Sequence, residues 1–85
     1  MFASVKILIV DDDADLREVV GLIFKGAGDK VAYATGVQEA LEQLEEDAFD
    51  AVLCDVQMAD GSGLEILSYI KKMKKDVRPL AFLMT

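Results

Sequence analysis

Residues 6–13 have the sequence Lys6-Ile7-Leu8-Ile9-Val10-Asp11-Asp12-Asp13, in which four apolar residues are followed by three acidic ones. An unbroken apolar run suits a strand that is covered on both faces, so this stretch predicts a central strand of a parallel sheet. The three aspartates mark its carboxyl end. A helix is expected next, with Asp13 as its N-cap and with its end at Gly26 or Gly28.

The remaining chain repeats this alternation of apolar strands and amphipathic helices. Further strands are expected at residues 30–34, 51–54 and 80–84, the last directly after Pro79. The resulting βαβαβαβ order predicts an α/β fold, an open parallel sheet with helices on both faces. The length favours a single domain spanning residues 1–85.

Apolar residues at helical spacing indicate the inner face of each intervening helix. The second and third helices are expected to begin with capping boxes, Thr35 with Gln38 and Ser62 with Glu65. The apolar positions are Leu16, Val19, Val20, Ile23 and Ala27 in the first helix, Val37, Ala40, Leu41 and Leu44 in the second, and Leu64, Leu67 and Ile70 in the third.

The composition excludes several classes of function. The chain has 85 residues, a net charge of −7, no histidine and one cysteine. Histidine zinc sites, Ser-His-Asp triads and intramolecular disulfides are therefore excluded, and Cys54 is expected to be a buried, inert thiol. The acidic charge argues against direct nucleic-acid binding, and no apolar run approaches the ~20 residues that span a bilayer. We expect a cytoplasmic protein.

Acidic residues stand where the predicted strands end. The first strand ends at Asp11, Asp12 and Asp13, the third at Asp55 and the fourth at Thr85. If these strands are neighbours, the side chains converge on one rim of the sheet, where carboxylates repel each other unless a cation is present. Mg²⁺ suits such an oxygen-rich site. Helix capping accounts for Asp13 but not for Asp55, so Asp12 and Asp55 are favoured as functional residues.

Two further motifs involve the acidic run. Asp11, Asp13 and Asp15 have the spacing that opens an EF-hand loop, but Leu16 and Leu22 occupy the positions that require Gly and Glu. Residues 7–13 also resemble the strand-end motif of dehalogenase-like phosphatases. Under that alternative, Asp11 would be the nucleophile and Asp13 the acid/base.

Three motifs together resemble the receiver domain of response regulators in two-component signalling. They are the strand and acidic run of residues 6–13, the strand ending at Asp55 within residues 49–58, and residues 63–67 at the expected distance. Thr85 falls where this family places a Ser or Thr after its fourth strand. The resemblance covers the whole chain and implies a flavodoxin-like fold.

The resemblance also implies roles for individual residues. Asp55 would accept a phosphoryl group from a histidine kinase or a phosphotransfer protein, so that the domain catalyses its own phosphorylation without being a turnover enzyme. Thr85 would hydrogen-bond the phosphoryl group, and Met58 and Ala59 would shape the loop above it. Mg²⁺ or Mn²⁺ would be held by Asp11, Asp12, Asp55 and the backbone carbonyl of Gln57.

The chain departs from the family pattern in two places. Ala59 stands where the family usually has Pro, and the last helix-strand-helix of a full receiver is lacking. The lysine that normally pairs with the phosphoryl group therefore has no counterpart here. The exposed edge of residues 80–84 predicts self-association as a homodimer. The alternative function is a receiver-like module that no longer switches and serves for dimerisation or docking.

Overall fold

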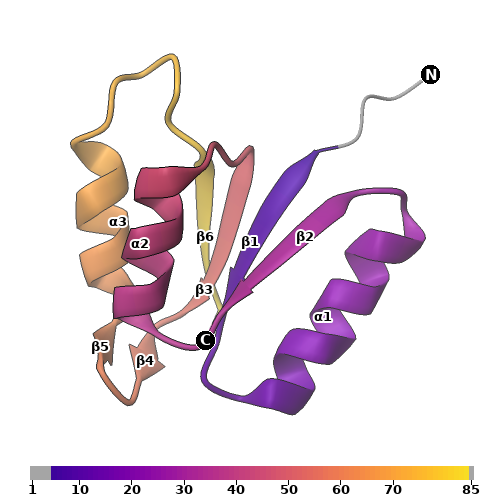
Figure 1. The fold of residues 1–85 in the computed structure, drawn as a ribbon. Helices are drawn as coiled ribbons and strands as arrows, with labels where there is room; N and C mark the ends of the chain where they lie inside the picture. Colours follow the sequence, from indigo (N-terminus) through magenta and orange to yellow (C-terminus); the bar gives the residue numbers. More distant parts are fainter. Residues whose placement is uncertain (1–4, 85) are drawn as a thin grey trace.

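A four-stranded parallel sheet forms the centre of the computed structural model, which describes residues 5–84 (Figure 1). The order of the strands is β2-β1-β3-β6, so the first, third and last strands are neighbours, as predicted. The parallel sheet and its helices confirm the predicted α/β fold. The strand bounds are Lys6–Val10 for β1, Lys30–Ala34 for β2, Ala51–Asp55 for β3 and Leu80–Met84 for β6.

Helices cover the two faces of the sheet unequally (Figure 1). Helix α1 (Ala14–Gly26) packs on β1 and β2 from one side, while α2 (Val37–Glu46) and α3 (Gly63–Lys71) pack together on the other. Two short strands, β4 (Gln57–Met58) and β5 (Gly61–Ser62), form an antiparallel pair in the connection between β3 and α3, where the sequence indicated only a loop.

Two of the three predicted helix starts are confirmed. The Asp13 carboxylate caps α1 by accepting from the backbone N–H groups of Asp15 and Leu16, at 3.0 and 3.2 Å. The Ser62–Glu65 capping box is present at α3. Helix α1 also ends as expected, at Gly26, and Gly28 follows with a φ of 89° that suits glycine.

The start of α2 differs from the prediction of a capping box. Its N-cap is Gly36, which has no side chain to accept a hydrogen bond, and the Thr35 hydroxyl donates to Glu39 instead. The Asp60 carboxylate, from the β4–β5 connection, accepts from the first helical N–H groups. A partner distant in sequence therefore accepts the hydrogen bonds that the predicted box assigned to the Thr35 side chain.

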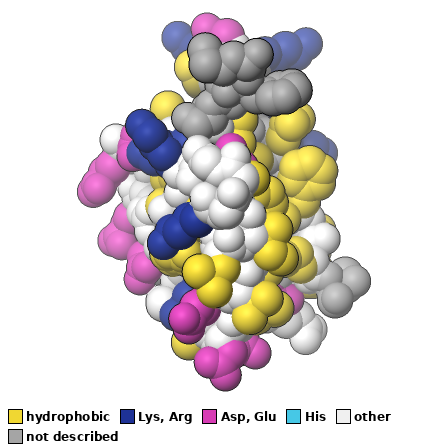
Figure 2. All heavy atoms as spheres, turned by 90° about the vertical axis from the view of Figure 1, so that its right-hand side faces the viewer, with side chains coloured by type: hydrophobic (Ala, Val, Ile, Leu, Met, Phe, Trp, Pro, Cys, Tyr) yellow, Lys and Arg dark blue, Asp and Glu magenta, His cyan; other side chains and the backbone are white. Residues whose placement is uncertain are grey.

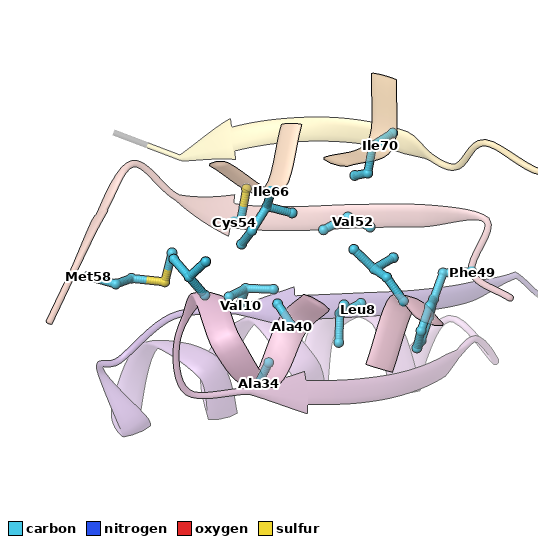
Figure 3. Close-up of a cluster of buried hydrophobic side chains, with 12 residues drawn as sticks. Leu8, Val10, Ala34, Ala40, Phe49, Val52, Cys54, Met58, Ile66 and Ile70 are labelled. Atoms are coloured by element: carbon cyan, nitrogen blue, oxygen red, sulfur yellow. The ribbon is translucent and has the colours of Figure 1, made fainter. Parts of the chain in front are cut away.

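The main core lies between the sheet and the pair α2 and α3 (Figure 3). Figure 3 shows Met58 at the carboxyl ends of the strands and Phe49 at the opposite end of this layer. The cluster contains Leu8, Val10, Ala34, Val37, Ala40, Leu44, Phe49, Val52, Cys54, Met58, Ile66 and Ile70. The predicted inner face of α2 is thus confirmed, with Leu41 packed at its margin, and so is the burial of the thiol.

The predicted inner face of α3 is partly wrong. Gly63, Ile66 and Ile70 are its buried residues, whereas Leu64 is 57% exposed. Gly63 lies at the start of the helix against the backbone of Asp55. Positions three and seven residues further along consequently face the sheet, because they lie on the same side of the helix.

The α1 side of the sheet is less completely covered. Ile7 and Ile9 are buried there, but Leu80 and Phe82 of β6 are 67% and 51% exposed. Within α1, which is described over its full length, Gly21 is the buried residue, and the expected apolar positions Leu16, Val19 and Ile23 are exposed. Figure 2 looks onto the side that carries α1 and shows hydrophobic side chains gathered in a band. None of the helices in the described residues has the length and hydropathy of a membrane span.

Candidate functional site

Three aspartates converge at the carboxyl ends of β1 and β3. Asp11 and Asp12 directly follow β1, and Asp55 is the last residue of β3, which pairs with β1 in parallel. Carboxylate oxygens of Asp11, Asp12 and Asp55 all lie within 4.8 Å of one another. The convergence that the sequence predicted for these residues is therefore present.

Asp11 is the buried member of the group, with 2% of its surface exposed. Its Oδ1 accepts a 2.9 Å hydrogen bond from the backbone N–H of Asp13, while its Oδ2 is buried without a hydrogen-bond partner among the described residues. A buried carboxylate oxygen without a partner is costly, and a bound cation removes that cost. Three carboxylates with one such oxygen are a donor set that fits a hard divalent cation.

Asp12 connects the end of β1 to the loop that follows β3. Its side chain is exposed, and its Oδ2 accepts a 3.0 Å hydrogen bond from the backbone N–H of Ala59. Ala59 was expected to shape the loop above the site, and this bond shows how its backbone contacts an aspartate of the cluster. Because Asp12 and Ala59 are far apart in sequence, the bond depends on the completed fold.

A glycine allows α3 to begin close to Asp55. A Cβ atom on Gly63 would lie 2.3 Å from the backbone oxygen of Asp55, so no larger residue fits without movement of the backbone. The Gly63 N–H also donates to the carbonyl of Val56 at 2.8 Å. Helix α3 thereby supports the connection immediately after Asp55.

The remaining predicted site residues have different surroundings. Gln57 is exposed in β4, where it pairs with Ser62. The Met58 side chain packs into the main core, so it anchors the loop to that core. Thr85 lies outside the described residues. In the described chain no Lys or Arg forms an ion pair with the three aspartates, and Lys6, at the opposite end of the sheet, pairs with Asp47.

Asp60 is the residue at this rim that the sequence did not reveal. Its carboxylate accepts hydrogen bonds from the backbone N–H groups of Val37 and Gln38, at 2.9 and 3.1 Å. The bonds from Gln38 and Val37 lower the pKa of Asp60. The sequence contains only a partial signal: Gly36 has no side chain with which to cap α2, and Asp60-Gly61 is typical of a turn, but neither pattern indicates that the two meet.

Comparisons with known proteins agree with the geometry. The response regulator receiver domain model matches residues 7–84. The chain is 41% identical over 70 residues to the transcriptional regulatory protein ZraR of Escherichia coli (strain K12), a match covering 82% of this chain and 16% of ZraR. The chain therefore spans only about a sixth of the length of that curated relative.

Solved receiver structures have the same fold. The chemotaxis response regulator CheY4 of Vibrio cholerae matches with a TM-score of 0.86 and 27% identity, over 95% of this chain and 68% of CheY4. The response regulator TrrA of Thermotoga maritima, solved in complex with Mg²⁺-BeF, matches with a TM-score of 0.79 and 33% identity, over 92% of this chain and 64% of TrrA. From its fold, its strand-end aspartates and these matches, the chain belongs to the response regulator receiver domain family.

Proposed function

We propose that Asp55 accepts a phosphoryl group from a histidine of a sensor kinase or phosphotransfer protein in two-component signalling. The observation that carries the proposal is the meeting of Asp11, Asp12 and Asp55 at one rim, with a buried oxygen on Asp11 that has no hydrogen-bond partner within residues 5–84. Membership of the receiver family supports the same assignment. The three carboxylates and the backbone carbonyl of Gln57 would hold Mg²⁺, or Mn²⁺ in its place.

The proposed chemistry is a transfer between a nitrogen and a carboxylate oxygen. An oxygen of Asp55 forms a bond to phosphorus while the phosphorus–nitrogen bond of the donor histidine breaks, and the leaving imidazole takes up a proton. A bound divalent cation neutralises the charge of the phosphoryl oxygens near the carboxylates. Because the modified chain is itself the product, the domain is an acceptor and not an enzyme that turns over a separate substrate.

The dehalogenase-like alternative finds less support. It requires Asp13 as a general acid/base, but the Oδ1 of Asp13 accepts two hydrogen bonds as the N-cap of α1. It also requires Asp11 as the nucleophile, and Asp11 is the buried member of the group. Asp55 is half-buried at the end of β3, which favours it as the acceptor.

The test is intact-mass analysis after incubation with acetyl phosphate, with and without Mg²⁺. We expect one phosphoryl adduct on the wild type that depends on Mg²⁺ and is absent from Asp55→Asn. Asp50→Asn is the matched control, because Asp50 is an exposed aspartate beside the opposite end of β3. An adduct that survives Asp55→Asn but is lost in Asp11→Asn would move the acceptor to Asp11, and a folded wild type without adduct would refute the proposal.

A second candidate function is dimerisation, and β6 is the observation that favours it. Among the described residues β6 pairs only with β3, so its other edge has free backbone groups. The strand contains no charged residue, and Leu80 and Phe82 are exposed on it. An apolar edge of this kind favours pairing with a strand of a second copy. Sedimentation of the wild type over a range of concentrations tests this, and a monomer at all concentrations would exclude it.

A further inference from the structure

The connection between β3 and α3 is held at two points by other parts of the molecule. On one side, Ala59 donates its N–H to Asp12 at 3.0 Å. On the other side, the Asp60 carboxylate accepts from Val37 and Gln38 at the start of α2, at 2.9 and 3.1 Å. Two consecutive residues therefore connect the aspartate cluster to the N-terminus of a helix.

Helix α2 depends on Asp60 for its cap. The first N–H groups of a helix have no partner within the helix, and the N-cap residue Gly36 has no side chain to offer one. A Cβ atom on Gly36 would lie 2.5 Å from the Oδ1 of Asp60. The absence of a side chain at this position makes room for the carboxylate, which also interacts favourably with the positive end of the helix dipole.

The rest of the connection leaves little freedom between these two contacts. Met58 is anchored in the core and pairs with Gly61 across the β4–β5 ladder. Further along, Glu65 accepts from the N–H of Ser62 in the capping box of α3. Only Ala59 and Asp60 lie between the paired residues Met58 and Gly61, so a displacement of Asp60 is transmitted to the Ala59 peptide.

We propose that Asp60 is a positioning residue for the aspartate cluster: by capping α2, it holds the Ala59 N–H against Asp12. The loop backbone and the carboxylate of Asp12 are then already in fixed relative positions before a phosphoryl group arrives. The effect on phosphorylation rests on the function proposed above, whereas the structural coupling between Asp60 and the Ala59 N–H does not.

The first test is amide hydrogen exchange, followed by NMR, on wild type, Asp60→Ala, Asp60→Asn and Asp50→Ala. Asp50→Ala is matched because it also removes an exposed carboxylate that accepts from a backbone N–H, here that of Lys6. We expect Asp60→Ala to accelerate exchange at Val37, Gln38 and Ala59 by about tenfold or more through local opening. Asp60→Asn keeps one acceptor oxygen and restores part of the protection. Unchanged exchange at Ala59 in Asp60→Ala would overturn the proposal whether or not the chain is phosphorylated.

The second test is the rate of labelling by acetyl phosphate at saturating Mg²⁺. We expect Asp60→Ala to label about tenfold more slowly than the wild type, because small displacements at a reacting centre are costly, and Asp60→Asn to recover most of the rate. Asp50→Ala should label at the wild-type rate. Equal rates in both alanine variants would show that Asp60 supports only the fold. No labelling of the folded wild type would refute the acceptor function and leave the exchange result to decide the coupling.

Discussion

The two faces of the sheet differ in how completely they are covered. On the α2 and α3 side, alternate residues of β1 and β3, such as Leu8 and Val52, are fully buried against two helices. On the α1 side, one helix covers β1 and β2, and the apolar residues of β6 remain exposed. The face covered by α2 and α3 therefore contributes more to the stability of the described chain, while the α1 side offers apolar surface for contacts with other segments or partners.

The aspartate cluster lies at the ends of the strands, and its support comes largely from the covered face. Met58 anchors the loop in that core, Gly63 begins α3 against Asp55, and Asp60 caps α2. Loss of packing between the sheet and α2 or α3 should therefore also disturb the site. Changes on the α1 side of β6 should affect association first.

The largest expected effect comes from making the same substitution, isoleucine to alanine, on each side of the sheet. Ile66 is fully buried against the sheet, and Ile23 of α1 is 66% exposed. We expect Ile66→Ala to lower the free energy of unfolding by about 2–5 kcal/mol, because it leaves a cavity in the main core. Ile23→Ala should change it by less than about 0.5 kcal/mol. Urea unfolding followed by circular dichroism measures both, and equal losses would contradict the difference between the faces.

Sequence patterns predicted the helices and strands best where the apolar positions of the pattern are also the buried residues. Val37, Ala40 and Leu44 have helical spacing and are buried, and the aspartates of the cluster were predicted because each directly follows an apolar strand. Ile66 was missed in favour of Leu64, because both are apolar and only the approach of α3 to the Asp55 backbone selects between them. The Asp11 oxygen that lacks a partner in the described part of the chain also lay beyond prediction, since its surroundings depend on side-chain orientation.

The cap of α2 shows a different limit of the sequence. A capping box is a local pattern, and residues 35–38 satisfied it approximately. Asp60 supplies the cap from a connection more than 20 residues away, which no local pattern encodes. Such a contact can be predicted only once the topology of the fold is known, because α2 and the β4–β5 connection come together only when β1 and β3 pair.

A smaller effect concerns Cys54, which belongs to the covered face. Burial raises the pKa of its thiol from 9.0 to about 11. The folded state thus keeps the thiol protonated at a pH where the unfolded chain forms a thiolate. This contribution to stability is present below pH 9 and is lost as the pH rises toward 11. We expect the free energy of unfolding to fall less steeply over this range in Cys54→Ala than in the wild type, measured by urea unfolding.

Alkylation by iodoacetamide at pH 8 gives an independent measurement of the same thiol. The folded wild type should react only as fast as it unfolds, because the thiol is buried and protonated. Urea above the unfolding midpoint should expose the thiol, which should then react at the rate of a free cysteine. Rapid alkylation without urea would show that the covered face opens far more readily than its packing implies.

A substitution on β6 should change the stability of the chain least and its association most. Phe82→Lys places a charge on an exposed position of the edge strand, and we expect it to convert a dimer into a monomer with a change in unfolding free energy of about 0.5 kcal/mol or less. Leu22→Lys is the matched control, because Leu22 is an apolar residue on α1 that is 61% exposed, against 51% for Phe82. Sedimentation should show the control associating like the wild type. If both variants dissociate, the interface includes α1, and if neither does, the β6 edge is not where two copies meet.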